Sequence, residues 1–341
     1  MKPLLLVLTV HFSIHSVRAQ EIFSWSKDSS YCSPSVVGLP RAKAVIIKYE
    51  VSPVFNIRSE GKQGGFGNSS AGLKRNGRLD LRLRFPIINK PGITIAAGIK
   101  YAHEEFLFKD ADLRNNYPFY KDLEDRPLKS IGLHFYVVKP RRTNKYFILR
   151  TSMDLNGDYS SDKFGKTEFL KFSMTPLIGW KKNENLSYAV GFSYGYTFGK
   201  PLIIPAVSIN KNFDCNWGIE SILPINVRLR YSPNDNNFFY GGLELAGGSY
   251  RLDNKDSAFK AFSRLHLFRS ELRFIMSYER AIHDWLWFGA EAGWRDNLRF
   301  NLTNGPKAMS DVIISNKLSG SLVANVSLFV VPPKGLLKRK R

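Results

Sequence analysis

The sequence predicts an all-β protein, a closed antiparallel transmembrane β-barrel of about fourteen strands, with twelve strands as the alternative. Three observations predict this fold. Apolar residues alternate with small or polar ones over long stretches, and the segments between these stretches are alternately short and long. In addition, no apolar run after Gln20 approaches the roughly 18 residues that a membrane-spanning helix needs. A barrel of this size can form from 341 residues as a single domain.

The first residues have the pattern of an export signal. Lys2 precedes an apolar run from Leu4 to Val10, and Val17 and Ala19 occupy the −3 and −1 positions of a cleavage site. We therefore expect export of the chain and cleavage before Gln20. The expected organisation is a signal peptide (1–19), a periplasmic N-terminal lead-in (20–42), the outer-membrane barrel (43–331) and a basic periplasmic tail (332–341).

The dominant pattern of the chain is an alternation with a period of two, which recurs from Lys43 almost to the C-terminus. The clearest case runs from Leu186 to Gly199, where large apolar residues take one parity and small or polar residues take the other. Several runs contain about ten to fourteen residues, which exceeds ordinary soluble strands and suffices for a tilted strand to cross a bilayer. The expected strands are 43–55, 78–86, 92–106, 129–138, 144–153, 168–180, 185–198, 202–210, 216–223, 225–232, 238–252, 267–279, 285–295 and 318–330.

The connections between these strands differ in length on the two rims of the barrel. Those after even-numbered strands are short, whereas those after odd-numbered strands include every long one: 56–77, 107–128, 154–167, 253–266 and 296–317. Outer-membrane barrels have this asymmetry, so we expect short periplasmic turns and long extracellular loops. Two odd-side connections, residues 200–201 and Pro224, are very short, which leaves twelve strands as the alternative.

Tryptophans at the ends of the expected strands predict the two membrane interfaces. Aromatic side chains gather in girdles where the bilayer meets water. The alternative is that aromatic residues simply favour strands. The girdle residues expected here are Trp180, Trp217, Trp285, Trp287 and Trp294.

Charged residues on the polar parity predict a wet, net-positive lumen. The basic residues expected there are Lys48, Arg82, Arg84, Lys100, Arg150, Lys171, Arg228, Arg230, Arg269 and Arg273. The acidic ones are Glu50, Asp80, Glu244, Glu271 and Glu291. Such a lumen favours anions. The alternative is a network of ion pairs that fills the barrel without conducting.

These observations lead to an expected function and to expected partners. We expect a passive pore or uptake channel for small, anionic solutes; the alternative is a structural or surface-interaction barrel without transport. The partners expected are outer-membrane lipid, lipopolysaccharide and a small anionic solute. The net charge of +21 would suit nucleic acid in the cytosol, but export removes that partner, so none is expected.

The chain has no convincing pattern for an enzyme, a cofactor or a metal site. Gly191–Gly195 matches G-x-S-x-G, but it lies within uninterrupted strand alternation instead of a strand-to-helix turn. Residues 154–165 resemble a calcium loop but carry Tyr159 where glycine is needed and Gly165 where glutamate is needed. Cys32 and Cys215 are both expected on the periplasmic side, where they are candidates for a disulfide; two free thiols are the alternative.

Several hairpin pieces resemble an uncharacterised family of outer-membrane β-barrel proteins, a domain of unknown function from Gram-negative bacteria of the Bacteroidota kind. The pieces are Leu83–Pro86, Gly98–Tyr101, Trp217–Pro224, Arg228–Pro233, Glu271–Tyr278 and Trp287–Trp294. The resemblance covers most of Lys43 to Val331. It implies the barrel fold and the cell outer membrane of a Gram-negative bacterium, and it assigns no activity or functional residues. One departure is that Phe329 is followed by further residues, whereas such barrels often end on an aromatic residue.

Overall fold

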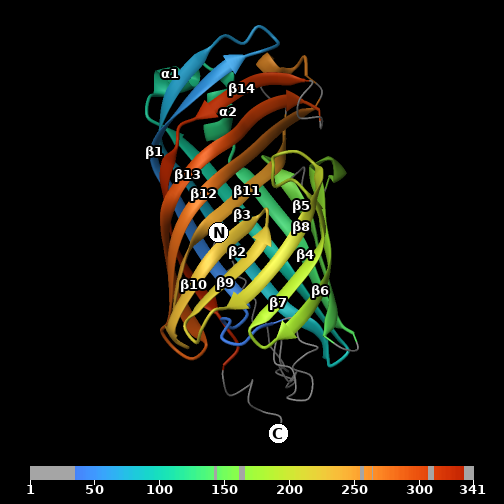
Figure 1. The fold of residues 1–341 in the computed structure, drawn as a ribbon. Coiled ribbons are helices and arrows are strands. Elements are labelled where there is room, and N and C mark those ends of the chain that lie inside the picture. Colours follow the sequence, from blue (N-terminus) through green and yellow to red (C-terminus); the bar gives the residue numbers. More distant parts are fainter. Residues whose placement is uncertain are drawn as a thin grey trace, which may run out of the picture.

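A computed structural model of the chain describes residues 35–141, 144–160, 166–253, 257–262, 264–305 and 311–333. Its strands form one sheet whose neighbours follow the chain order, and β1 pairs with the last strand to close it. The last strand is interrupted at Ser319 and Gly320, so that β14 and β15 both pair with β1 and β13. The fold is therefore the predicted closed antiparallel barrel of fourteen strands (Figure 1).

The strands are tilted and long, and two short helices lie in the connection between β3 and β4 (Figure 1). The helices are α1 (Ala111–Asn115) and α2 (Pro118–Asp125), with 3-10 turns η3 (Thr167–Phe169) and η4 (Ser257–Phe259). The strands are β1 (Val45–Gly61), β2 (Ser69–Lys90), β3 (Ile93–Phe108), β4 (Leu128–Pro140), β5 (Lys145–Gly157), β6 (Leu170–Asn183), β7 (Leu186–Gly195), β8 (Leu202–Asn212), β9 (Trp217–Leu223), β10 (Asn226–Asn234), β11 (Asn237–Leu252), β12 (Leu265–Ala281), β13 (Leu286–Asn304), β14 (Val312–Leu318) and β15 (Ser321–Val330).

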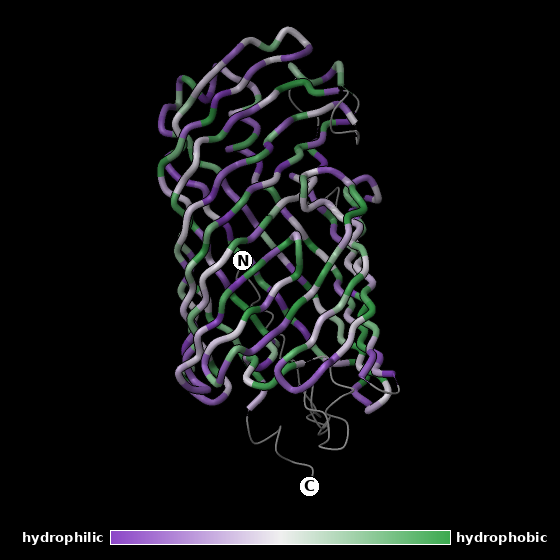
Figure 2. Tube along the Cα trace, viewed as in Figure 1, coloured by the Kyte–Doolittle hydropathy of each residue, from purple (hydrophilic) through white to green (hydrophobic). Residues whose placement is uncertain are grey.

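The alternation of the sequence divides each strand between an outer and an inner face. Large apolar side chains of one parity, such as Ile178, Val190 and Phe274, are exposed on the outside of the barrel. Hydrophobic and hydrophilic residues alternate along the tube in the middle of the barrel (Figure 2). No helix among the described residues is long and apolar enough to cross a membrane. The exposed apolar belt is the surface expected of strands that contact lipid.

The strands of one side of the barrel continue well beyond their expected ends. β1 and β2 extend through most of the expected loop 56–77, and β13 continues to Asn304. Alternation on the outer face is weak there, because residues such as Arg58 and Glu60 replace the apolar parity. β7, in contrast, ends at Gly195 instead of residue 198, before a turn in which Gly199 has a φ of 79°.

We call the end of the barrel that carries α1 and α2 the outer end (top in Figure 1). On the opposite side of the barrel the wall reaches less far towards this end, because β9 and β10 are short. β9 and β10 contain 7 and 9 residues, and the N–H of Leu245 in β11 donates to the carbonyl of Ile225 at the top of their hairpin. β11 continues above this point and pairs with β5 through Arg251 and Gly157. The upper part of the barrel therefore closes without β6 to β10 and is narrower than the part below it.

Candidate functional site

The inner faces of β1, β2, β3, β12 and β13 carry a network of buried ion pairs. Arg273 binds both carboxylate oxygens of Glu50 at 3.0 Å and also contacts Glu271. Arg269 places one guanidinium nitrogen 2.5 and 2.6 Å from the two oxygens of Glu104. These side chains are less than 10% exposed. The pairing compensates the desolvation of each charge, because a buried ion is stable only when it is paired and hydrogen-bonded.

Glu271 joins the two halves of this network. Its carboxylate lies 3.4 Å from Arg269 and 3.7 Å from Arg295, in addition to its contact with Arg273. Arg295 also donates to Asn76 Oδ1 and Ser321 Oγ, both at 2.9 Å. Glu271 is therefore the carboxylate shared by three arginines from two neighbouring strands.

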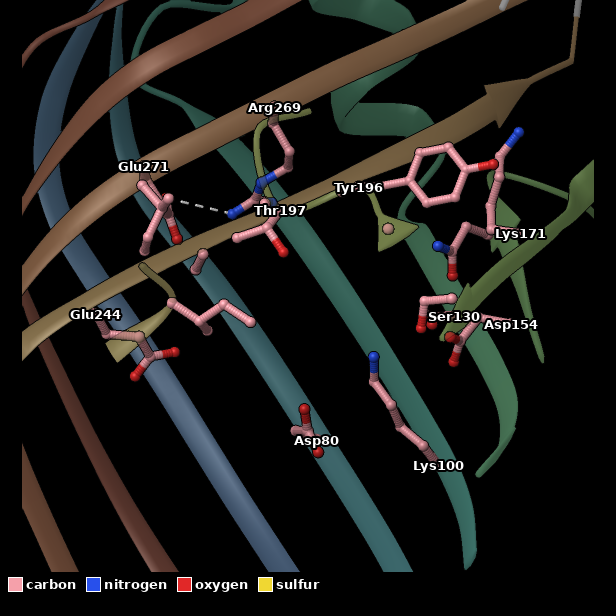
Figure 3. A pocket seen from close by; sticks show the side chains of 18 of the residues that line it. Asp80, Lys100, Ser130, Asp154, Lys171, Tyr196, Thr197, Glu244, Arg269 and Glu271 are labelled. Carbon is pink, nitrogen blue, oxygen red and sulfur yellow. Dashed lines mark hydrogen bonds and ion pairs between the residues drawn. The ribbon is translucent and has the colours of Figure 1, made fainter. Parts of the chain in front are cut away.

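Beside the network the lumen holds a polar cavity of about 380 Å³. Its walls come from β1 to β7, β11 and β12 and from the start of the β7–β8 connection (Figure 3). Lys100 and Lys171 project into it from the side opposite β12 (Figure 3). The charged residues that line it are Lys48, Arg78, Arg82, Lys100, Lys171, Arg269 and Arg273, with Glu50, Asp80, Asp154, Glu244 and Glu271.

Four of the basic residues expected in the lumen lack an acidic partner among the residues that the structure describes. Among the residues that the structure describes, no carboxylate lies within ion-pair distance of Arg84, Lys100, Arg150 or Lys171. Arg84 and Arg150 are exposed, and Arg150 lies 5.4 Å from the centre of the Tyr136 ring. Lys171 is only 7% exposed, and its ammonium lies 5.9 Å from the Tyr196 ring. Among the described residues these four cations outnumber Glu244, the cavity carboxylate that is likewise in no ion pair, so the described lumen carries an excess of positive charge.

The outer end of the lumen is filled by apolar side chains. α2 directs Phe119 and Tyr120 inward, where they are 1% and 0% exposed. Phe119 packs edge-on against Phe300 of β13 at 6.4 Å between ring centres, and Tyr120 stacks on Phe108 of β3 at 5.0 Å. We call this apolar cluster, which also includes inward residues of β1, β2, β11, β12 and β14, the outer plug. Its apolar interior resembles the core of a soluble protein and contrasts with the polar lumen below.

Ionic contacts tie the outer plug to the surrounding loops. Arg126, directly after α2, lies 3.2 Å from Asp158, which follows β5, and donates to the carbonyl of Asp253, which follows β11. Asp158 also accepts the N–H of Asp253 at 2.7 Å. Burial raises the pKa of Asp158 to about 6, an effect that outweighs the attraction of Arg126.

The inner end of the lumen is crossed by residues 35–44, which we call the inner strap. The N–H of Val37 donates to the carbonyl of Glu184 in the β6–β7 turn at 3.0 Å, and Asn212 of β8 donates to the carbonyl of Val37 at 2.8 Å. Arg230 of β10 donates to the carbonyl of Gly38 at 2.7 Å. The strap is thus attached to the wall opposite β1, and its last residues lead into β1.

The second half of the inner strap lies over an aromatic cluster inside the barrel. Arg41 lies 3.1 Å from Asp284 in the β12–β13 turn and 5.6 Å from the centre of the Trp287 ring. Lys43 lies 2.5 Å from Glu279 and 4.0 Å from the centre of the Phe329 ring. The strap and this cluster, which also contains Phe238 and Tyr240, cover the inner end of the lumen on that side.

The structure places the expected lumen residues as follows. Ten of the fifteen line the cavity: Lys48, Arg82, Lys100, Lys171, Arg269, Arg273, Glu50, Asp80, Glu244 and Glu271. Arg228 and Arg230 lie nearer the inner end, 2.8 and 3.2 Å from Glu220. Glu291 lies 3.4 Å from Lys48. Arg84 and Arg150 take the inward parity of β2 and β5 without ion pairs to described carboxylates.

The expected list omits four members of the network: Asn76, Arg78, Glu104 and Arg295. Their odd or even position along the strand could have identified them as residues that face the lumen. Glu104 follows Lys100 by four residues on β3, and Arg78 precedes Arg82 by four on β2, so each shares the face of a residue already expected in the lumen.

The expected tryptophans divide between the two faces. Trp217, Trp285 and Trp294 are exposed, and Trp180 stacks on Tyr188 at 5.6 Å. Trp287 departs from the expected girdle, because it is 2% exposed and packs in the lumen against Phe238 and Phe329. Within β13 its parity is inward, whereas Trp285 lies in the preceding turn. Trp217 instead begins an outward row that continues through Tyr231, Phe239 and Tyr278.

Two other expectations concern residues near the inner rim. Cys215 is an exposed free thiol in the β8–β9 turn, and Cys32 lies outside the described residues, as do the expected signal peptide and most of the basic tail. Ser193 of the G-x-S-x-G match faces inward from β7 and bonds to Thr175 at 2.7 Å. No group of metal-binding side chains occurs within the described ranges.

Comparison with known proteins finds outer-membrane barrels. No protein-family model matches the chain. No curated protein sequence matches it either. Among solved structures, an outer-membrane channel of Pseudomonas putida F1 is 12% identical, covers 86% of this chain and 98% of its own, and has a TM-score of 0.40. A FadL homologue of Pseudomonas aeruginosa is 9% identical over 84% of this chain and 90% of its own, with a TM-score of 0.38. The KdgM porin is 7% identical over 84% and 99%, with a TM-score of 0.35.

These likenesses are remote. They identify neither the family suggested by the hairpin pieces nor a solute. The chemistry of the lumen is therefore the basis for any statement about function.

Proposed function

We propose that the protein is a channel of the bacterial outer membrane for small anionic solutes and that its lumen is closed in the state described here. The observation that carries this proposal is the set of inward cations without acidic partners, Arg84, Lys100, Arg150 and Lys171. A lumen lined by uncompensated positive charge concentrates anions and repels cations. Export of the chain, with cleavage after Ala19, and contact with lipid and lipopolysaccharide are part of the proposal.

The two ends of the lumen supply the physical reason for a closed state. The inner strap is held mainly by hydrogen bonds, ion pairs and cation–ring contacts, and Val36 is the one apolar side chain of residues 35–44 that is buried. The outer plug is held by a fully buried apolar cluster. Local opening free energies are lowest where few apolar contacts hold a segment, so the strap is the end that opens first.

Conductance across a planar bilayer tests the proposal. We expect the wild-type barrel to conduct little and a strap-deletion variant to conduct more, with a reversal potential in a salt gradient that indicates anion preference; this variant lacks residues 35–42 and also carries Phe119→Ala to loosen the outer plug. Replacing both Arg84 and Arg150 by Gln in that variant should shift the reversal potential towards cations. A cation preference in the strap deletion, or equal selectivity after the two replacements, would contradict the proposal.

A barrel that does not conduct is the second candidate, and the outer plug is the observation that favours it. Its apolar side chains come from both helix and strand residues and fill the narrow upper barrel. If neither the wild-type barrel nor the strap deletion conducts, although both show the heat-modifiable gel migration of folded barrels, the second candidate replaces the first.

A further inference from the structure

The wall of the cavity formed by β3 to β6 combines positive charge with buried oxygen atoms that make no hydrogen bond to a described residue. In the register of the sheet, Lys100, Gly132, Asp154 and Lys171 lie side by side on four consecutive strands. Ala102, Ser130 and Asn156 form the neighbouring row, two residues further towards the outer end. All but Gly132 and Ala102 among these residues line the cavity, and Figure 3 shows Lys100, Ser130, Asp154 and Lys171 around the same space.

Three oxygens of this wall have unused hydrogen-bonding capacity. Ser130 Oγ, Asp154 Oδ1 and Asn156 Oδ1 are buried and make no hydrogen bond to any described residue. Asp154 Oδ1 lies 3.3 Å from His134 Nε2, without hydrogen-bond geometry, while its other oxygen accepts from Ser152. Buried polar atoms are nearly always hydrogen-bonded, so a wall of this kind is suited to a ligand that brings donors.

Lys171 of the same wall is a buried cation, which favours a ligand that carries a negative charge. Its side chain is 7% exposed, and no carboxylate of the described residues lies within ion-pair distance. Although Asp154 is its neighbour in the register, the ammonium of Lys171 lies beside the Tyr196 ring at 5.9 Å (Figure 3). A buried, unpaired cation is costly, and a bound anion removes that cost.

Small residues leave space between Asp154 and the rest of the cavity wall. A Cβ atom at Gly132 would lie 1.9 Å from Asp154 Oδ1, so glycine is what allows the carboxylate to lie across β4. Hydroxyl groups of Ser173, Thr175 and Ser193 continue the polar lining towards β7. The cavity of about 380 Å³ lies at the lower end of the usual size of small-molecule sites, about 300 to 1,000 Å³.

We propose that this wall binds the anion of a polyhydroxylated carboxylic acid, with the carboxylate at Lys171 and the hydroxyl groups at Ser130, Asp154 and Asn156. The inference rests on the proposed channel function and names its solute class. Asp154 disfavours a second negative charge on the ligand, which argues against a dianion such as phosphate. The three acceptors require several donors, which a simple fatty or alkyl carboxylate lacks.

Calorimetric titration of the folded barrel in detergent tests this assignment with defined probes. Gluconate carries one carboxylate and five hydroxyl groups, sorbitol retains the hydroxyl groups without the charge, and hexanoate retains the charge without the hydroxyl groups. We expect gluconate to bind at least about tenfold more tightly than either analogue or inorganic phosphate. Equal affinities for gluconate and hexanoate, or for gluconate and sorbitol, would overturn the proposal.

Substitutions identify the site. Lys171→Gln should weaken gluconate binding by about tenfold or more, since a hydrogen bond to a charged group is lost. Ser130→Ala combined with Asn156→Leu should reduce the preference for gluconate over hexanoate. Lys211→Gln, at an exposed lysine of β8, is the matched control and should leave the affinity unchanged. Unchanged gluconate affinity in folded Lys171→Gln would also overturn the assignment.

The solute class and the channel function fail in different ways. Anion-selective conductance without preferential binding of gluconate leaves the channel in place and removes the polyhydroxy acid. Preferential binding without conductance in either the wild type or the strap deletion leaves the binding site and removes the channel.

Discussion

Replacement of Glu271 by Gln is the sharpest test of the buried ionic network. The variant keeps the shape of the side chain and removes its charge. Arg273 retains Glu50, and Arg269 retains Glu104, but Arg295 has no other carboxylate within ion-pair distance in the described part of the chain. Breaking a buried pair typically costs about 3–5 kcal/mol. Because Asn76 and Ser321 still bond to Arg295, we expect the lower end, about 3 kcal/mol.

The assay is reversible urea unfolding of the barrel from lipid vesicles, followed by tryptophan fluorescence. Glu291→Gln is the matched control, because Glu291 is partly exposed and lies 3.4 Å from Lys48. Partly exposed pairs contribute up to about 1 kcal/mol, so the control should unfold close to the wild type. A free energy of unfolding for Glu271→Gln equal to that of Glu291→Gln would refute the reasoning and show that lumen water solvates the network.

Three further predictions concern the plug, the loops and the lipid-facing surface. Phe119→Ala should destabilise the outer plug by about 3–5 kcal/mol and speed proteolysis of the outer loops, because a fully buried aromatic ring is lost; unchanged cleavage rates would contradict this. The pKa of Asp158 is raised to about 6 in the folded protein, so the folded state favours the protonated carboxyl group. The stability that this protonation contributes is present at low pH and is lost as the pH rises through 6. Urea unfolding at pH 5 and 7.5 should therefore show a larger gain at pH 5 for the wild type than for Asp158→Asn, and equal gains would argue against it. Met276→Arg places a charge on the outer face of the barrel, at a side chain that is 76% exposed. An arginine on a lipid-facing strand costs about 2–4 kcal/mol of folding free energy at the bilayer midplane, so we expect the variant to be less stable in vesicles. No loss of stability would mean that this face does not contact lipid.

Local sequence pattern was sufficient for the barrel and for the face of most strand residues. A strand has a period of two, so one apolar parity specifies the outward face of residues such as Val190 and, with it, the inward face of Lys100 or Arg269. The lengths of the connections could likewise be read from the sequence, and they predict which rim of the barrel carries the short turns and which carries the long loops. The outer extensions of β1, β2 and β13 escaped prediction because both of their faces change character beyond the membrane, where no apolar outer parity is required.

Tertiary structure alone decided which inward groups meet. Arg269 is 165 residues from Glu104 and Arg273 is 223 residues from Glu50, and only closure of the barrel brings these pairs together. The same closure places α2 in the outer end of the lumen and the inner strap across the other end. A period of two reports which face a side chain takes, but the partners across a lumen depend on barrel size and strand stagger, which no single strand encodes.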